Sequence, residues 1–129
     1  MGLDNGVVFR TKKPITYPKW VMARRFIRHE NGGEVCYWRR CRGLREDVLN
    51  MLGECEEETE FYLTVDNVRA IRKILVGYFL HPCRWRKSAW EWKETWSMQF
   101  KHILSLSWLE RYMRRHPDDI EWVIFYDSY

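Results

Sequence analysis

The stretch FYLTVDNVRAIRKILVGYFL, residues 61–80, combines two hydrophobic patterns and decides the fold class. Its first five residues are mostly aromatic or β-branched, as is typical of a strand. Asp66 then offers an N-cap carboxylate to the free N–H groups of a first helical turn. The hydrophobic residues beyond it recur at helical spacing and form one stripe: Val68, Ile71, Leu75, Tyr78 and Phe79. We therefore predict a strand followed directly by a helix that ends before Pro82.

The chain after this stretch repeats the helix signal and then the strand signal. Ser88 and Glu91 have the spacing of a capping box, which predicts a helix over residues 88–115. Its expected apolar face is Trp92, Trp96, Phe100, Ile103 and Leu104, extended by Trp108, Leu109 and Tyr112 or Met113. The segment IEWVIFYDSY, residues 120–129, is rich in β-branched and aromatic residues and predicts a strand.

The chain before this stretch predicts further strands and one more helix. VVFR, residues 7–10, is expected to be a strand, and segments 21–28 and 34–38 are expected to form a hairpin around Asn31-Gly32-Gly33. A helix is predicted to begin near Trp38–Arg40 and to end at Leu52, with Gly53 as its C-cap. Its stripe is Trp38, Cys41, Leu44, Val48 and Leu52.

The order of these elements predicts an α+β fold. We expect a small, mainly antiparallel sheet with about three helices packed on one face. A length of 129 residues is typical of one domain, residues 1–129. The order of the strands in the sheet does not follow from the sequence.

The composition is aromatic and mildly basic. Aromatic residues make up 16% of the chain, eight of them Trp, and the net charge is +4. This charge permits nucleic-acid binding but is weaker than a dedicated nucleic-acid-binding domain usually shows. Neither a signal-peptide pattern nor an apolar run long enough for a membrane span is present, so we expect a cytoplasmic protein with reduced cysteines.

Metal and catalytic motifs are weak. Cys36 and Cys41 have four residues between them, and His81-Pro82-Cys83 is the only tight ligand pair, with no second pair to match it. Side chains at positions i and i+2 of an extended loop point apart, which disfavours a Cys–His nucleophile at 81–83. We predict no metal, no cofactor and no catalytic residues, and we favour a non-enzymatic protein.

Basic and aromatic residues alternate in two segments, which are the candidate binding residues. The segments contribute Arg39, Arg40 and Arg42, and then Arg84, Trp85, Arg86, Lys87 and Trp90. Single-strand binders place aromatic stacking platforms beside cations in this way. The competing interpretation is that most tryptophans are in the core and that the arginines are solvated. The cations at 111, 114, 115 and 116 are explained by the dipole of the helix that ends there.

Several short segments resemble, in order, a set of small phage and prophage proteins. The opening Met1-Gly2-Leu3-Asp4 and the segment Tyr37-Trp38-Arg39-Arg40 are similar to elements of that group, as are Phe61–Asp66, Trp90-Glu91-Trp92 and Trp122–Tyr126. The group usually has Ala-Asn where this chain has Cys41-Arg42. The resemblance implies a cytoplasmic protein of a bacterial host cell and implies no reaction.

Three functional hypotheses follow. The favoured one is a phage-type or prophage-type accessory protein that is non-enzymatic and binds a protein partner. The alternative is a nucleic-acid-binding module that uses segments 37–42 and 84–87. The third is a hydrolase or metalloprotein that uses His81 and Cys83.

Overall fold

The computed structural model describes residues 4–15, 18, 21, 31–39, 41–53, 59–80 and 89–128, without the side chains of 39, 42 and 89–98. It contains the strands β1 (Asp4–Thr11), β2 (Gly32–Arg39), β3 (Glu60–Tyr62) and β4 (Ile120–Ser128). Its helices are α1 (Arg42–Leu52), α2 (Val65–Leu80) and α3 (Ala89–Arg115), and a short 3₁₀ helix, η2 (Pro117–Asp119), precedes β4. The predicted α+β class is confirmed.

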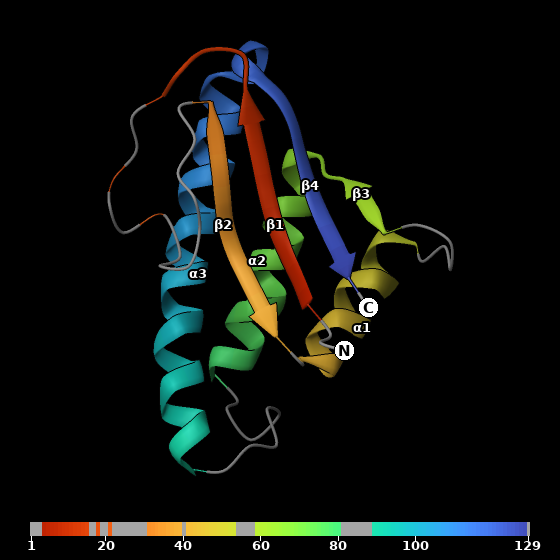
Figure 1. Cartoon of the computed structure of the whole chain (residues 1–129), viewed down its shortest axis with the longest axis vertical. Helices are drawn as coiled ribbons and strands as arrows, with labels where there is room; N and C mark the ends of the chain where they lie inside the picture. The colour runs from red at the N-terminus through yellow and green to blue at the C-terminus, as the bar shows by residue number, and fades with distance from the viewer. Residues whose placement is uncertain are drawn as a thin grey trace.

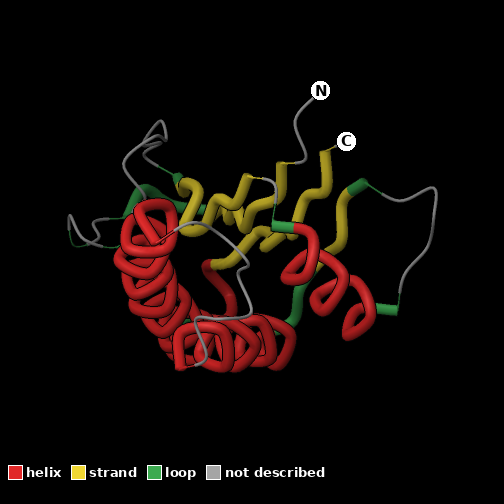
Figure 2. Tube along the Cα trace, turned by 90° about the horizontal axis from the view of Figure 1, so that it is seen from below, coloured by secondary structure: helices red, strands yellow, loops and turns green. Residues whose placement is uncertain are grey.

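The four strands form one antiparallel sheet in the order β2-β1-β4-β3. The sheet is one layer and the helices lie on one of its faces (Figure 1, Figure 2). Helices α2 and α3 cross behind the strands in Figure 1, and α1 lies beside the lower end of β4. The expected one-sided helix layer is therefore what the structure shows.

The hydrophobic core lies between the sheet and the helices, and strand alternation selects the side chains that enter it. Val7 and Phe9 of β1 pair with Phe125 and Val123 of β4, and all four side chains are buried. The helices contribute the second half of the core with Leu44, Val48, Val68, Ile71, Leu75, Leu106 and Leu109. The predicted stripe of α2 is confirmed at Val68, Ile71, Leu75 and Tyr78.

The N-cap of α2 differs from the prediction. The helix begins at Val65, so Asp66 lies inside its first turn and Thr64 takes the cap position. The Thr64 hydroxyl accepts a hydrogen bond from the Asn67 backbone N–H at 3.2 Å, and Asn67 Oδ1 accepts one from the Thr64 N–H at 3.0 Å. This reciprocal pair satisfies two otherwise free donors, as in a capping box. Asp66 still contributes negative charge at the helix N-terminus.

The boundary between β2 and α1 also differs. The predicted turn residues Gly32 and Gly33 already belong to β2, and Trp38 is a strand residue instead of the start of a helix stripe. Trp38 was assigned to the helical repeat although it follows the two-residue repeat of a strand. The two patterns cannot be distinguished over only a few residues. Gly53 is confirmed as the C-cap of α1, with a φ of 78° that favours glycine.

The inward face of α3 is more polar than predicted. Phe100 and Leu104 were expected in the core but are 48% and 37% exposed. The buried positions are Gln99, His102, Ser105 and Leu106, together with Leu109, which the prediction had placed on the apolar face. The polar members have partners, because Gln99 Oε1 accepts from Trp38 Nε1 at 2.8 Å and Ser105 donates to the Val21 carbonyl.

Several predictions fall on parts of the chain that the structure does not describe. These are the segment 22–28 of the expected hairpin, the Ser88 cap, and the side chains of Trp92 and Trp96. The 88–115 helix is confirmed over Ala89–Arg115, and the 120–129 strand is confirmed over Ile120–Ser128.

Candidate functional site

The binding residues predicted from the sequence have no described side chains. Arg39 is the last residue of β2, Arg42 the first of α1, and Trp90 the second of α3. The end of β2 and the starts of α1 and α3 lie at the same end of the molecule, the lower end in Figure 1. Arg40, Arg84, Trp85, Arg86 and Lys87 lie outside the described residues. Binding by these residues therefore stays a prediction.

The described residues point to a different candidate site, the face of the sheet opposite the helices. We call it the open face, because none of the described helices covers it (Figure 2). Strand alternation turns every second side chain toward it. Its side chains are Asp4, Val8 and Arg10 of β1, Glu34 and Tyr37 of β2, Glu60 and Tyr62 of β3, and Trp122, Ile124 and Tyr126 of β4.

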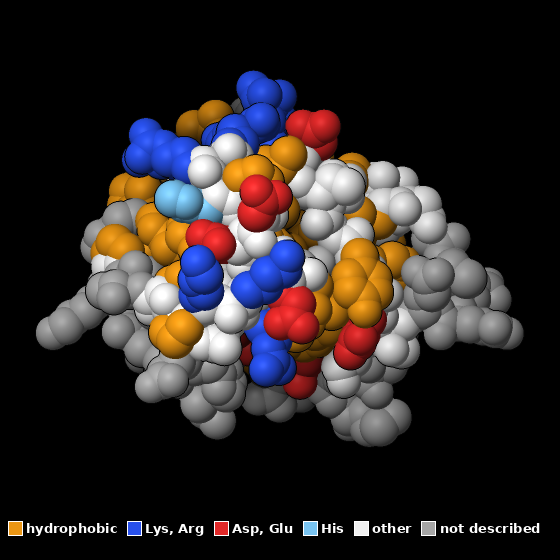
Figure 3. All heavy atoms as spheres, turned by 90° about the horizontal axis from the view of Figure 1, so that it is seen from above, with side chains coloured by type: hydrophobic (Ala, Val, Ile, Leu, Met, Phe, Trp, Pro, Cys, Tyr) orange, Lys and Arg blue, Asp and Glu red, His pale blue; other side chains and the backbone are white. Residues whose placement is uncertain are grey.

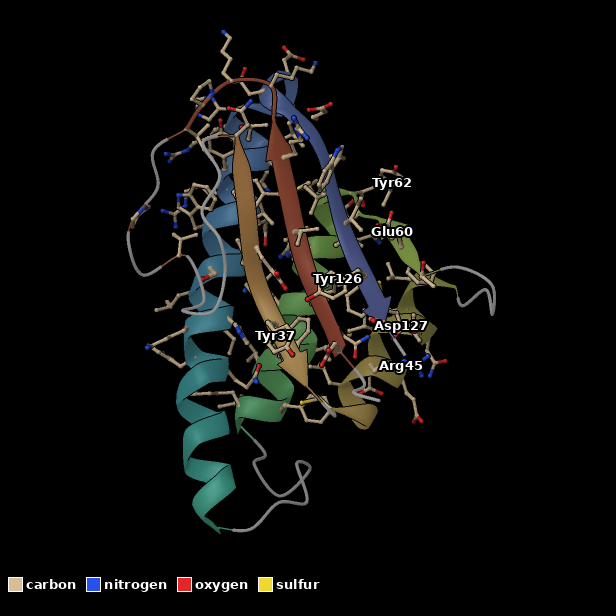
Figure 4. All side chains as sticks on the ribbon, viewed as in Figure 1. Tyr37, Arg45, Glu60, Tyr62, Tyr126 and Asp127 are labelled. Carbon is tan, nitrogen blue, oxygen red and sulfur yellow. The ribbon has the colours of Figure 1, made fainter. Side chains whose placement is uncertain are left out.

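The strand register arranges the open face in rows. Val8 pairs with Glu34 on one side and Ile124 on the other, and Ile124 pairs with Tyr62. Ile124 is 7% exposed although it lies on the face of the sheet away from the helices, whereas the neighbouring Tyr62 is 72% exposed. The middle of the face is therefore apolar, and it has an exposed aromatic ring at the β3 edge of the sheet (Figure 4).

The next row places two tyrosines around a glycine. Gly6 pairs with Tyr37 of β2 and with Tyr126 of β4. The Tyr126 hydroxyl reaches across β1 and donates to Glu34 Oε1 at 2.5 Å. A Cβ at position 6 would lie 2.6 Å from both Glu34 Oε1 and Tyr126 Cε1. Glycine at this position therefore leaves the space in which Tyr126 and Glu34 meet, on the side turned to the viewer in Figure 4.

Among the side chains that the structure describes, the open face has more acids than cations at this row and below it. The Tyr37 hydroxyl donates to Asp4 Oδ1 at 3.0 Å, so each tyrosine holds one carboxylate. Glu60 pairs with Tyr126 in the register and is exposed. Arg10, farther along β1, contacts Glu121 at 3.3 Å. The described side chains thus place three acids, Asp4, Glu34 and Glu60, around two tyrosines. The described cation of this face, Arg10, lies farther along β1 and contacts Glu121.

Burial changes the acid–base behaviour of the tyrosine pair. It raises the pKa of Glu34 from 4.5 to about 7, although the hydrogen bond from Tyr126 acts in the opposite direction. Burial, and next the bond to Glu34, raise the pKa of Tyr126 far above its ordinary value. Near neutral pH, Glu34 therefore exchanges between its neutral and charged forms while Tyr126 remains a hydrogen-bond donor.

A buried ion pair fixes the end of the sheet below these tyrosines. Arg45 of α1 contacts Asp127 of β4 with two bonds, Nε to Oδ1 and Nη2 to Oδ2, each 2.8 Å (Figure 4). Asn5 Nδ2 donates to Asp127 Oδ1 at 2.6 Å. Asn5 Oδ1 is buried and accepts no hydrogen bond within the described chain. This cluster attaches α1 to the central strands, which explains the buried Arg45 and Asp127 charges.

The buried cysteine and histidine near β2 lack the properties of a catalytic pair. Burial raises the pKa of the Cys36 thiol well above its ordinary value and lowers the pKa of His102 to about 3. Both groups are therefore neutral at physiological pH. His102 Nδ1 lies 3.1 Å from Gln99 Oε1, and Nε2 accepts from the Tyr37 N–H at 3.4 Å. His102 thus binds the free edge of β2 to α3.

No group of three or more His, Cys, Asp or Glu residues in the described part of the chain is placed to hold a metal ion. None of the helices described is both long and apolar enough to cross a membrane.

The open face was not identified as a site from the sequence, although a signal for it exists. Trp122, Ile124 and Tyr126 alternate with Val123, Phe125 and Asp127, so one set must face away from the other. Together with helices on one side only, this alternation predicts an uncovered aromatic face. The fold and this face define a small α+β protein with one helix-covered and one open sheet face. Comparisons with protein-family models, curated proteins and solved structures found no match.

Proposed function

We propose that the protein is a non-enzymatic accessory protein that binds a protein partner through the open face. The observation that carries the proposal is the exposed Tyr62 at the β3 edge of a sheet face that none of the described helices covers. Aromatic residues are enriched in protein interfaces because they bury a large area at a small entropy cost. A broad sheet face also suits a macromolecule better than a small ligand, which is usually enclosed.

The charge of the open face indicates the chemistry of the partner. Asp4 and Glu60 lie beside the tyrosines, and Glu34 adds a further negative charge when it is ionised, so the complementary surface carries Lys or Arg side chains. Such complementarity accelerates encounter and excludes acidic partners. It also disfavours nucleic acid at this face, because phosphates would meet carboxylates.

The resemblance to small phage and prophage proteins supports an origin of this kind and a place in the cytoplasm of a bacterial host. We propose this origin and this location together with the binding function. The alternative, nucleic-acid binding by segments 37–42 and 84–87, has no stacking surface in Trp38, which is 2% exposed and was expected in the core. Its arginines lie where no side chains are described, so it stays a prediction.

Two matched pairs of variants test the proposal. A partner is isolated from a bacterial lysate with the purified protein, then purified itself, and its affinity is measured directly. Tyr62→Ser should weaken binding at least tenfold, because aromatic anchors contribute about 2 kcal/mol or more at an interface. Phe100→Ser is the control, since Phe100 is an exposed aromatic on α3.

The second pair tests charge. Glu60→Lys should weaken binding and reduce its salt dependence, whereas Glu46→Lys, at an exposed position of α1, should not. Equal effects of Tyr62→Ser and Phe100→Ser would contradict the proposal, as would an acidic partner surface. Turnover in a broad substrate panel, lost on changing one polar residue, would contradict the non-enzymatic part.

A further inference from the structure

A hollow between α2 and α3 is lined mainly by arginines. Its volume is about 360 Å³, and its lining residues are Arg72, Ser107, Glu110, Arg111, Arg114 and Arg115. We call it the arginine hollow. It belongs to the helix layer, so it is separate from the open face. Figure 3, seen from above, shows Lys and Arg side chains gathered at the end of the molecule where α3 ends.

The arginine hollow has a surplus of positive charge. Arg72 and Arg114 contact Glu110 at 3.0 and 3.2 Å, and Arg114 also lies 3.9 Å from Asp66. Burial acts to raise the pKa of Glu110, but the bonds and charges of these two arginines outweigh it and leave the pKa below its ordinary value. Glu110 is therefore ionised. Arg111 and Arg115 have no ion-pair partner among the residues that the structure describes.

The arrangement orders some donors and leaves others free. Glu110 holds Arg72 and Arg114 in place, which reduces the entropy lost when they bind an anion. Arg111 and Arg115 are four residues apart and therefore lie on one side of α3, where both are exposed. Guanidinium groups match phosphate oxygens with paired donors, and the Ser107 hydroxyl adds another donor.

The surroundings of the hollow extend its positive charge along α2. Arg69 and Lys73 are exposed and lie four residues apart on one side of that helix, and Arg69 is also a neighbour of Arg72, three residues further on. The arginines at the C-terminal end of α3 are accounted for by the helix dipole in isolation. In the structure, these arginines of α3 also lie beside the cations of α2. The dipole of α3 does not explain why cations of two helices lie together.

We propose that the arginine hollow binds the phosphate backbone of a nucleic acid without sequence preference. The cations extend over two helices and the lining arginines of α3 are exposed, so the site suits a long polyanion passing over the surface better than an enclosed small molecule. Among the residues that the structure describes, its lining contains no aromatic residue on which a base could stack. Phosphate contacts without stacking or base contacts give binding that depends on salt and not on sequence.

The test is fluorescence anisotropy with labelled duplex and single-stranded DNA of two unrelated sequences, at about 50 to 200 mM KCl. Arg111→Gln with Arg115→Gln should weaken binding to both sequences by about tenfold or more. It should also reduce the slope of log K against log salt by about 1.8 for duplex and about 1.4 for single strands, corresponding to two lost phosphate contacts. Circular dichroism and thermal unfolding verify that the variant is folded.

Two controls separate this site from general charge and from the other basic segment. Lys101→Glu, at an exposed position of α3, removes the same two units of charge and should change affinity less than threefold. Arg84→Gln with Arg86→Gln should also leave most of the affinity intact. The proposal is overturned if all three variants weaken binding equally, if the 84/86 variant alone does so, or if a phosphoserine peptide binds the hollow while DNA does not.

Discussion

The Arg45–Asp127 pair should be among the costliest contacts in the protein to break. Its side chains are 15% and 8% exposed, and two bonds of 2.8 Å join them. Arg45→Met leaves the Asp127 carboxylate with Asn5 as its remaining described side-chain donor. An unpaired buried charge of this kind costs about 3–5 kcal/mol. We therefore expect the free energy of unfolding to fall by that amount.

A second substitution shows how much of this cost comes from the isolated charge. Arg45→Met together with Asp127→Leu removes both charges and leaves apolar side chains of similar length. The remaining loss is the acceptor of Asn5 Nδ2, which is worth about 1–3 kcal/mol. Independent sites would instead give the sum of the single losses, about 6–10 kcal/mol. The coupling energy between the two positions should accordingly be at least about 3 kcal/mol.

Urea unfolding followed by circular dichroism measures these values. With a slope of about 2 kcal/mol per molar urea, the Arg45→Met midpoint should fall by about 2 M. Arg10→Met is the matched control, because the Arg10–Glu121 pair is 56% and 49% exposed and contributes about 0–1 kcal/mol. The reasoning is refuted if Arg45→Met and Arg10→Met cost the same, or if the double variant loses the full sum.

Three further predictions concern the tyrosine pair and the inward face of α3. Gln99→Leu should cost about 2–6 kcal/mol in urea unfolding, since Trp38 Nε1 and the ring of His102 both lose the oxygen they share. Folding raises the pKa of Glu34 from 4.5 to about 7, so the native state binds more protons than the unfolded state between these values. Stability should therefore fall as pH rises through this window, and Glu34→Gln should flatten that dependence while Glu60→Gln should not. Gly6→Ala should cost about 1–3 kcal/mol and lower the pKa of Tyr126 in an ultraviolet titration, because the new Cβ displaces Tyr126 from Glu34; an unchanged titration would contradict this.

Element types were predictable where one hydrophobic period extends over many residues. The stripe Val68, Ile71, Leu75 and Tyr78 identified α2, and the β-branched and aromatic segment at 120–129 identified β4. The cap of α2 was misplaced by two residues, since both Thr64 and Asp66 are good N-cap residues and the sequence does not rank them. Short elements such as β3 were predicted with less accurate ends.

The inward face of α3 was not predictable from hydrophobicity. Gln99 and His102 are buried because Trp38 and the β2 edge supply their partners, and those partners come from residues more than sixty positions earlier. Phe100 is exposed although it is more hydrophobic, and it packs beside Phe79 of α2 with ring centroids 5.8 Å apart. Helix periodicity shows which residues share a side of a helix. Tertiary contacts decide which of these sides faces the sheet.

The candidate site was hidden for the same reason. The sequence directs attention to Arg84–Lys87, a local cluster, whereas the open face combines side chains from four strands spread along the chain. The arginine hollow likewise needs α2 and α3 to be neighbours before Arg72 and Arg111 belong to one surface. Local sequence patterns identify sites made of consecutive residues and miss those assembled by the fold.

The strand order has a consequence for how the protein is made. β4 lies between β1 and β3, and it is the only strand in the described sheet that pairs with β3. Its pairing with β1 joins Asp4 to Ser128. During synthesis, β1 therefore emerges long before β4, with which it pairs. The sheet cannot be completed until residues 120–128 have left the ribosome. Such distant pairing slows folding and leaves strand edges exposed for longer. A nascent chain stalled before residue 120 should accordingly expose an unpaired β1 edge, accessible to chaperones or to another copy of itself.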